Sequence, residues 1–235
     1  MNLKFFKMKT PVLTLFALML FFAACEKDPF EANSGTFTDE RDGREYKWVK
    51  IGDQVWMAEN LAYVPYVCAP DSQCGIWVYS YHGEGSYGSM LHTYGALYDW
   101  ETAMEVCPEG WHLPSDQEWM ELERYLGMEE EQLDRTGIIR GAEANVGGKL
   151  KESGSTYWKE PNEGATNENG FAALPGGILL DDKSFSSLKS AAYLWSSTSN
   201  ESNTAFCRML HYYGENVTRK KISKISGLSV RCIKN

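Results

Sequence analysis

The stretch from Cys107 to Trp119, CPEGWHLPSDQEW, places a thiol, an imidazole and three carboxyl groups close together in the sequence. A cysteine beside a histidine could supply a nucleophile and its general base. Cys107, His112 and Glu118 are also residue types that bind zinc, but their spacing matches no recognised zinc motif. Both chemical interpretations compete with a structural one, in which these residues shape the joint between two helices.

Two short helices are predicted around this stretch. The first spans 99–106, and its apolar face consists of Trp100, Ala103 and Met104. The second begins at Ser115, because Ser115 and Glu118 fit a capping box, in which each side chain accepts a hydrogen bond from the other residue's backbone amide. The residues predicted to be buried along this helix are Trp119, Leu122, Tyr125 and Leu126, and Gly127 is predicted to end it. Glu118 is thereby committed to the helix start, and we expect neither a catalytic nor a zinc site here.

The remaining segments favour short strands and long loops. Aromatic and β-branched residues on both sides of Gly52 and Asp53 predict a hairpin between residues 37 and 61. Residues 62–95, rich in Gly and Tyr, are interpreted as a long, partly irregular excursion, and long ordered loops often carry function. Strand-like islands follow at 170–174, 192–195, 204–210 and 228–233. Helices early and short strands late predict an α+β fold with an antiparallel sheet.

The first 24 residues have the features of an export signal. Three lysines precede an apolar run at 11–22, which is too short to span a bilayer. The run ends in Phe22-Ala-Ala-Cys25, which resembles the lipobox of bacterial lipoproteins, although Phe22 replaces the usual aliphatic residue. We therefore expect a signal peptide at 1–24, a lipid on Cys25 and a flexible tether at 25–36. Ordinary cleavage after Ala24 is the alternative.

The charge of the mature chain bears on its partners. Removal of residues 1–24 takes away three lysines and leaves 20 basic against 32 acidic side chains, a formal charge of −12. Such a chain is not expected to bind nucleic acid or an anionic membrane surface through charge. Its only predicted link to a membrane is the lipid anchor.

The cysteines predict disulfides, because an exported chain meets oxidising or thiol-poor surroundings. Cys68 and Cys74 bracket a short loop of turn-forming residues and are expected to pair by proximity alone. Apart from Cys25, three more remain, at Cys107, Cys207 and Cys232. One of these three must stay unpaired.

The spacing of Trp100, Ala103 and Cys107, followed by Gly110, Leu113, Glu118 and Leu122, resembles the helical signature of C-type lectin-like domains. That resemblance implies two short helices packed on small twisted antiparallel sheets with long loops. It also implies a disulfide between Cys107 and Cys232, which leaves Cys207 as a buried thiol.

A more extensive resemblance covers about 190 residues. The fragments are DGREYKWVKIGDQVWMAENL, YGALYDWETAMEVCPEGWHLPSDQEW, ATNENGFAALPGG, LWSST and LSVRCIK. They are similar to the Fibrobacter succinogenes major paralogous domain, a family of exported, often lipid-anchored bacterial proteins without a general enzymatic activity. The resemblance implies one domain at 37–235. The segment Leu113 to Trp119 also looks like formylglycine-generating-enzyme-type domains, but the late cysteines do not recreate that catalytic arrangement.

Calcium is the one cofactor that the sequence suggests. Glu160-Pro161-Asn162 reproduces a triplet by which many C-type lectins bind calcium and sugar, and Glu160 and Asn162 would supply hard oxygen ligands. The partner Trp-Asn-Asp motif of those lectins is missing. Chance occurrence in a stretch rich in Asn and Glu is the alternative, as is a structural calcium elsewhere in 160–170.

Aromatic residues of the excursion are the candidate ligand-binding set: Trp77, Tyr79, Tyr81, His82, Tyr87, His92 and Tyr94. Such rings can stack on sugar faces or form a hot spot for a protein partner. Their alternative role is a small satellite core that fixes the long loop.

Together these features predict a lipid-anchored protein of the outer membrane or cell surface. Its lectin-like domain is expected to be non-catalytic and to bind a glycan or an extracellular protein. The alternative is a structural or assembly component of a surface fibre or outer-membrane complex.

Overall fold

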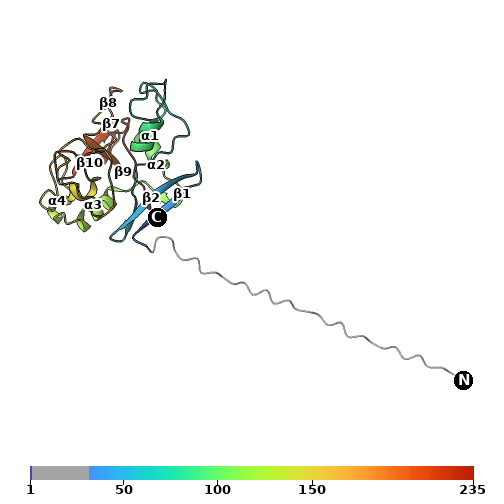
Figure 1. Ribbon diagram of the computed structural model, residues 1–235, viewed down its shortest axis with the longest axis horizontal. Coiled ribbons are helices and arrows are strands. Elements are labelled where there is room, and N and C mark those ends of the chain that lie inside the picture. The colour runs from blue at the N-terminus through green and yellow to red at the C-terminus, as the bar shows by residue number, and fades with distance from the viewer. Residues whose placement is uncertain (2–31) are drawn as a thin grey trace.

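The computed structural model describes Met1 and residues 32–235 (Figure 1). The predicted signal peptide, the lipidation site Cys25 and most of the tether lie outside the described residues. None of the helices in the described part of the chain has the length and apolar character needed to cross a membrane.

The described domain has an α+β fold, as predicted, with short helices and several small antiparallel sheets. The helices are α1 (Gly88–Tyr94), α2 (Trp100–Glu105), α3 (Asp116–Tyr125), α4 (Glu130–Leu133) and α5 (Val146–Leu150). The strands are β1 (Ser34–Asp39), β2 (Arg44–Ile51), β3 (Gln54–Met57), β4 (Ile76–Trp77), β5 (Leu97–Tyr98), β6 (Trp111–His112), β7 (Ile178–Leu179), β8 (Phe185–Ser186), β9 (Ala191–Glu201), β10 (Thr204–His211), β11 (Thr218–Ser223) and β12 (Ile233–Lys234).

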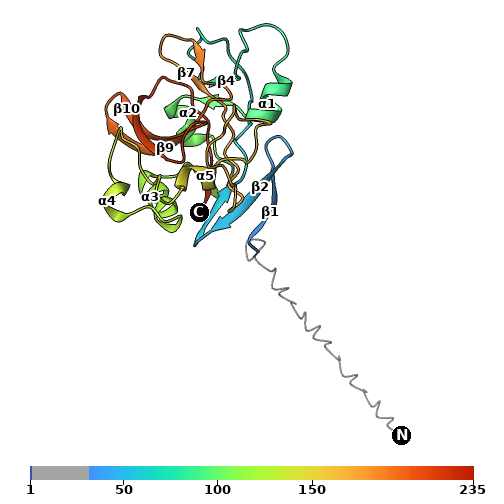
Figure 2. The same ribbon diagram turned by 60° about the vertical axis from the view of Figure 1, so that its left-hand side comes forward.

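The largest sheet joins the two ends of the domain in the order β1-β2-β3-β12-β6. The predicted hairpin is present, with Ile51 opposite Gln54 and Gly52 at a φ of 62°, a conformation that glycine adopts without strain. The C-terminal strand β12 lies between β3 and β6, so the C-terminus lies beside the β1–β2 hairpin (Figures 1 and 2).

A second sheet has the order β11-β10-β9, and Figure 2 shows its strands β9 and β10 apart from the β1–β2 hairpin. Two-stranded pairs β4–β5 and β7–β8 hold the long loops. The predicted islands at 192–195 and 204–210 lie within β9 and β10. The island at 170–174 forms only a single bridge between Lys151 and Ala173, so its prediction as a strand was wrong.

The two predicted helices are α2 and α3, and the capping box of α3 is confirmed. Ser115 Oγ accepts from the Glu118 amide at 3.2 Å, and Glu118 Oε2 accepts from the Ser115 amide at 2.7 Å. Gly127 ends the helix at a φ of 101°. Met104 and Tyr125, predicted to be buried, are instead 43% and 65% exposed. Both residues lie near the C-terminal end of their helix, whereas the other predicted positions, Trp100, Ala103, Trp119, Leu122 and Leu126, belong to the core.

Two other boundaries differ from the predictions. β1 begins at Ser34, so residues 34–36 belong to a strand and not to the tether. The excursion at 62–95 contains α1 and β4. Both are short and lack the periodicity that would have indicated them.

Both predicted disulfides are present. Cys68 pairs with Cys74 at a Cα–Cα distance of 6.3 Å, and Cys107 pairs with Cys232 at 6.0 Å. Cys207 is a free thiol that is fully buried in β10, and burial raises its pKa to about 12. It therefore stays protonated at neutral pH and behaves as a small apolar side chain.

A buried ion network connects α3 to the β9–β11 sheet. Glu123 lies between Arg140 and Arg208, with N–O distances of 2.8 and 2.6 Å. Asp116 lies between Arg208 and Arg219, at 2.6 Å from each. These arginine neighbours lower the pKa of Asp116, although burial alone would raise it. The network fixes α3 by charge pairs that water cannot reach.

Candidate functional site

The residues of CPEGWHLPSDQEW are occupied by structural contacts. Cys107 is in a disulfide. The His112 ring lies 2.8 Å from Glu118 Oε1 through Nε2 and 2.7 Å from Asn235 Oδ1 through Nδ1. Hydrogen bonds from the Ser115 amide and hydroxyl, together with the His112 contact, outweigh burial and lower the pKa of Glu118. Within residues 32–235, no group of three His, Cys, Asp or Glu side chains is placed to hold a metal ion.

The aromatic residues of the excursion divide into separate groups. Trp77 is 2% exposed, packs with Leu97 and Leu179, and donates from its indole nitrogen to Ala69 O at 3.2 Å. The rings of Tyr79 and His82 lie 5.0 and 5.7 Å from Phe185. This first group has the contacts of a satellite core. A ligand role for these residues stays a prediction. Trp77 could contact a ligand only if the residues that cover it moved away.

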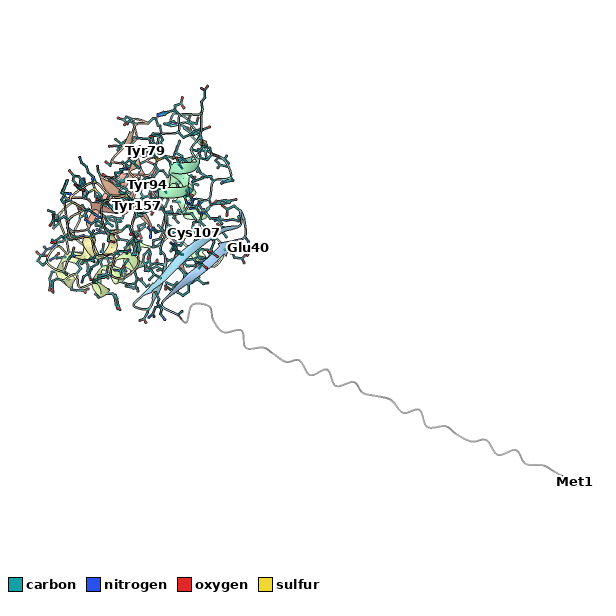
Figure 3. All side chains as sticks on the ribbon, in the orientation of Figure 1. Met1, Glu40, Tyr79, Tyr94, Cys107 and Tyr157 are labelled. Carbon is teal, nitrogen blue, oxygen red and sulfur yellow. A yellow bond between two sulfur atoms is a disulfide. The ribbon has the colours of Figure 1, made fainter. Side chains whose placement is uncertain are left out.

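Of the other predicted aromatic residues, Tyr81 and Tyr87 precede α1, and His92 and Tyr94 lie within it. Tyr81 and Tyr87 make an edge-to-face pair with ring centres 5.0 Å apart, packed against the main core. Tyr94 is 5% exposed, whereas His92 is exposed. Figure 3 shows Tyr94 beside Tyr157, with Tyr79 farther toward the upper end of the molecule. The seven residues therefore form no single stacking surface.

The Glu160-Pro161-Asn162 triplet lies on the loop after α5, and its peptide bond before Pro161 is cis. Glu160 is exposed, but Asn162 is only 5% exposed. The Asn162 side-chain amide donates to Glu152 O at 2.9 Å and to Gly154 O at 2.7 Å, so it braces its own loop. Calcium binding by Glu160 and Asn162 stays a prediction.

Lys151 supplies a positive charge at the base of the same loop. Its Nζ donates to three backbone oxygens, those of Glu163, His211 and Gly214, at 2.6, 3.1 and 3.0 Å. This ammonium group ties the 152–174 loop to the turn after β10. The side chain is 0% exposed, and burial lowers its pKa to about 8.

This arrangement predicts a pH effect on stability. Above pH 8 the folded protein releases the Lys151 proton, which the unfolded chain keeps until near its ordinary pKa of 10.5. The unfolded state then binds more protons, so folding stability rises with pH in this window.

Urea unfolding measures this effect. From pH 7.5 to 9.5, the free energy of unfolding of the wild type should rise by about 2 kcal/mol relative to that of Lys151→Met. The exposed control Lys221→Met should follow wild type. A pH-independent difference between wild type and Lys151→Met would show that the three carbonyls preserve the ordinary pKa.

The 152–174 loop encloses one wall of a cavity of about 490 Å³, which we call the loop cavity. The opposite walls come from the β2–β3 hairpin and α1. Its lining residues are Arg44, Lys47, Ala58, Glu59, His92, Thr93, Glu152, Tyr157, Asn167, Gly170, Ala172 and Leu174. One predicted residue, His92, is among them, and Tyr94 lies directly behind.

The acceptors of the loop cavity are fixed by neighbouring groups. One Glu59 oxygen accepts from the Lys47 amide at 3.0 Å, and one Glu152 oxygen accepts from the Asn167 amide group at 2.9 Å. Asn167 in turn accepts from the Ala172 amide at 2.9 Å. The second oxygen of each carboxylate takes no part in these hydrogen bonds. These bonds fix the positions of the two carboxylates around the same space.

One aromatic ring belongs to the cavity. Tyr157 is 37% exposed, and its ring meets the Tyr94 ring edge-on at 6.4 Å. The Tyr94 hydroxyl donates to the backbone oxygen of Tyr157 at 3.4 Å. Burial raises the pKa of Tyr94, so its hydroxyl remains a donor at neutral pH. α1 therefore positions the ring that the loop presents.

The floor of the cavity is held by Arg231, a fully buried cation that has no carboxylate at ion-pair distance among the described residues but interacts electrostatically with Glu59 and Glu152. Its guanidinium donates to Asn60 Oδ1 at 2.8 Å, Met57 O at 3.1 Å, Ala172 O at 2.7 Å, and also to Phe171 O. Burial lowers its pKa to about 9, which still leaves it charged at neutral pH. Arg231 thereby links the last strand region to the cavity wall at 171–172.

Comparison with known families now bears on this geometry. The model of the family described as the Fibrobacter succinogenes major domain matches residues 49–234. The chain belongs to this family. The comparisons found no curated protein and no solved structure that matches the chain. The match begins within β2 and runs to β12, so both disulfides and most of the loop cavity lie inside the Fibrobacter succinogenes major domain.

Most of the cavity was not predicted from the sequence. Tyr157 stands in a stretch that reads as a polar turn region, and Arg44 and Lys47 resemble ordinary exposed strand residues. One signal was available for Arg231, a charged residue inside the apolar run Leu228 to Ile233. Such an interruption indicates a buried charge with a fixed set of partners.

Proposed function

We propose that this chain is a non-catalytic binding protein, anchored by lipid at the bacterial outer membrane or cell surface, whose loop cavity binds a glycan. The observation that carries the proposal is the combination, in one cavity, of one partly exposed tyrosine ring, two carboxylates held in position and several side chains that can donate hydrogen bonds. Sugars present hydroxyl groups, which both donate and accept, on a ring with apolar C–H faces. A site for them needs both kinds of polar group and an aromatic surface.

Each part of that requirement has a residue in the loop cavity. Arg44, Lys47 and His92 can donate, whereas Glu59 and Glu152 can accept. Tyr157 offers its ring face. The lining thus carries side chains of both charge signs, Arg44 and Lys47 against Glu59 and Glu152.

We propose binding rather than catalysis, because both cavity carboxylates already serve as structural acceptors. Glu59 accepts from the Lys47 backbone amide, and Glu152 accepts from the Asn167 side-chain amide. The best-supported function is therefore recognition. Calcium could contribute through Glu160, which is exposed on the same loop.

Glycan-array screening of residues 26–235, the mature chain without its lipidated cysteine, with calcium and with a chelator, tests the class of ligand. We expect binding to a limited set of glycans. Binding that disappears with the chelator would support the calcium contribution, and unchanged binding would remove it. Uniformly blank arrays would contradict the glycan proposal.

A substitution at Tyr157 tests the site. Tyr157→Ala removes the ring but keeps the backbone oxygen that anchors Tyr94. We expect affinity for the glycan identified on the array to fall roughly tenfold, as expected for loss of one aromatic contact of about 1.4 kcal/mol. Titration calorimetry measures the change. Tyr213→Ala, which removes a tyrosine that is 64% exposed and outside the cavity, is the matched control and should bind as wild type.

A structural role in a surface assembly is the second candidate, favoured by the free edge of β1. In the described sheet β1 pairs only with β2, so its other edge can accept a strand from another chain. Size measurement of the purified protein by light scattering separates the candidates. A stable oligomer that disperses when Thr36→Pro is introduced would favour assembly over recognition.

A further inference from the structure

A second cavity shares no lining residue with the loop cavity. Its volume is about 470 Å³, and it lies between the start of the excursion and α2. Tyr63, Pro65 and Tyr66 form one wall, whereas Glu101 and Glu105 form part of the other. We call it the α2 cavity. No residue of the predicted ligand-binding set lines it.

The wall formed by the excursion is fixed in position. The Tyr98 hydroxyl donates to Tyr63 O at 2.8 Å. The Cys68 amide donates to Ile76 O at 3.1 Å beside the Cys68–Cys74 disulfide. Tyr66, which stands between these anchors, is 53% exposed and presents a free ring. The cavity therefore has an exposed aromatic ring on a backbone segment that is anchored on both sides.

The wall formed by α2 carries unpaired negative charge. Glu101 and Glu105 are one helical turn apart and exposed, and neither side chain has a hydrogen bond or ion pair with any residue of the described chain. Like charges at this spacing repel each other. A cation placed between them and Tyr66 would relieve that repulsion.

The one basic residue of the cavity is already neutralised. Arg41 donates to both carboxylate oxygens of Asp39, at 2.8 and 2.6 Å, and to Val106 O at 2.9 Å. Its guanidinium also lies 3.8 Å from the centre of the Tyr63 ring. The net charge around the cavity is thus negative. The Arg41–Tyr63 contact shows the geometry by which this wall holds a cation.

We propose that the α2 cavity binds a basic side chain, arginine or lysine, presented by a partner protein. The apolar stem of such a side chain packs on Pro65 and Tyr66, and its charged head lies between Glu101 and Glu105. A neutral sugar would leave the two carboxylates unpaired, and an anionic sugar would be repelled. This inference does not depend on glycan binding in the loop cavity.

Saturation-transfer NMR on the full chain in detergent tests the proposal with defined peptides. The probe is acetyl-Gly-Arg-Gly-amide, and its citrulline counterpart, which keeps the shape but lacks the charge, is the matched ligand. We expect saturable binding of the arginine peptide, at least tenfold weaker binding of the citrulline peptide, and weakening as salt rises.

Two double variants with equal loss of charge locate the site. Glu101→Gln with Glu105→Gln should weaken binding of the arginine peptide about tenfold, because both carboxylates that face its charged head are removed. Glu109→Gln with Glu131→Gln, which removes two exposed carboxylates elsewhere, should leave binding unchanged. Equal binding of the two peptides, no saturation at about 10 mM, or unchanged binding by the Glu101/Glu105 variant would each overturn the proposal.

Discussion

Replacement of Glu123 by glutamine is expected to lower the free energy of unfolding by about 3–5 kcal/mol. Glu123 is 0% exposed and is the only carboxylate within ion-pair distance of Arg140 in the described structure. Its loss leaves three arginines around one remaining carboxylate, Asp116, where water cannot compensate the charge. Urea unfolding followed by tryptophan fluorescence measures the change.

The control for this variant lies on the same helix. Glu121 is exposed, so Glu121→Gln removes the same charge with an expected effect within about 0.5 kcal/mol. If Glu123→Gln unfolds at the same urea concentration as Glu121→Gln, the buried network does not stabilise the fold as described. The prediction concerns removal of one member only, because exchanging the whole network for apolar residues can be neutral.

Removal of the Cys107–Cys232 disulfide is expected to have an effect of similar size. The bridge closes a loop with a sequence separation of 125 residues. In the chain-entropy model, a loop of this length stabilises the folded state by about 5 kcal/mol. The double variant Cys107→Ala with Cys232→Ala should therefore unfold at a much lower urea concentration than wild type.

The other disulfide provides an internal comparison. Cys68 and Cys74 are separated by 6 residues, for which the same model gives about 2 kcal/mol. Changing both to alanine should thus cost less than half as much. Equal losses in the two double variants would contradict the entropic interpretation and indicate that local packing dominates. Cys207, buried and protonated, should remain unreactive in both backgrounds.

Features that depend on neighbouring residues in the sequence were predicted correctly. The capping box needs only Ser115 and Glu118, and the hairpin turn needs only Gly52 and its flanking strands. The Cys68–Cys74 pair followed from proximity. The Cys107–Cys232 pair came from a family resemblance, because nothing local specifies a contact across 125 positions.

The cavity and the ion network depend on contacts that no local pattern encodes. Tyr157, His92 and Lys47 come from three distant segments, and only the folded loop brings them together. Tyr125 was predicted to be buried from its helical position. It is the last residue of α3, and its ring lies over Gly52 at the surface instead.

The central claim, that a glycan binds in the loop cavity, is tested most directly by oxidative footprinting of the mature protein. The protein is labelled alone and with the glycan that binds most strongly on the array, and modification of individual tyrosines is read by mass spectrometry. The account predicts that the glycan protects Tyr157 and leaves Tyr213 and Tyr66 unchanged. Protection of Tyr66 or Tyr213 with Tyr157 still fully labelled, or no glycan that binds at all, would contradict it.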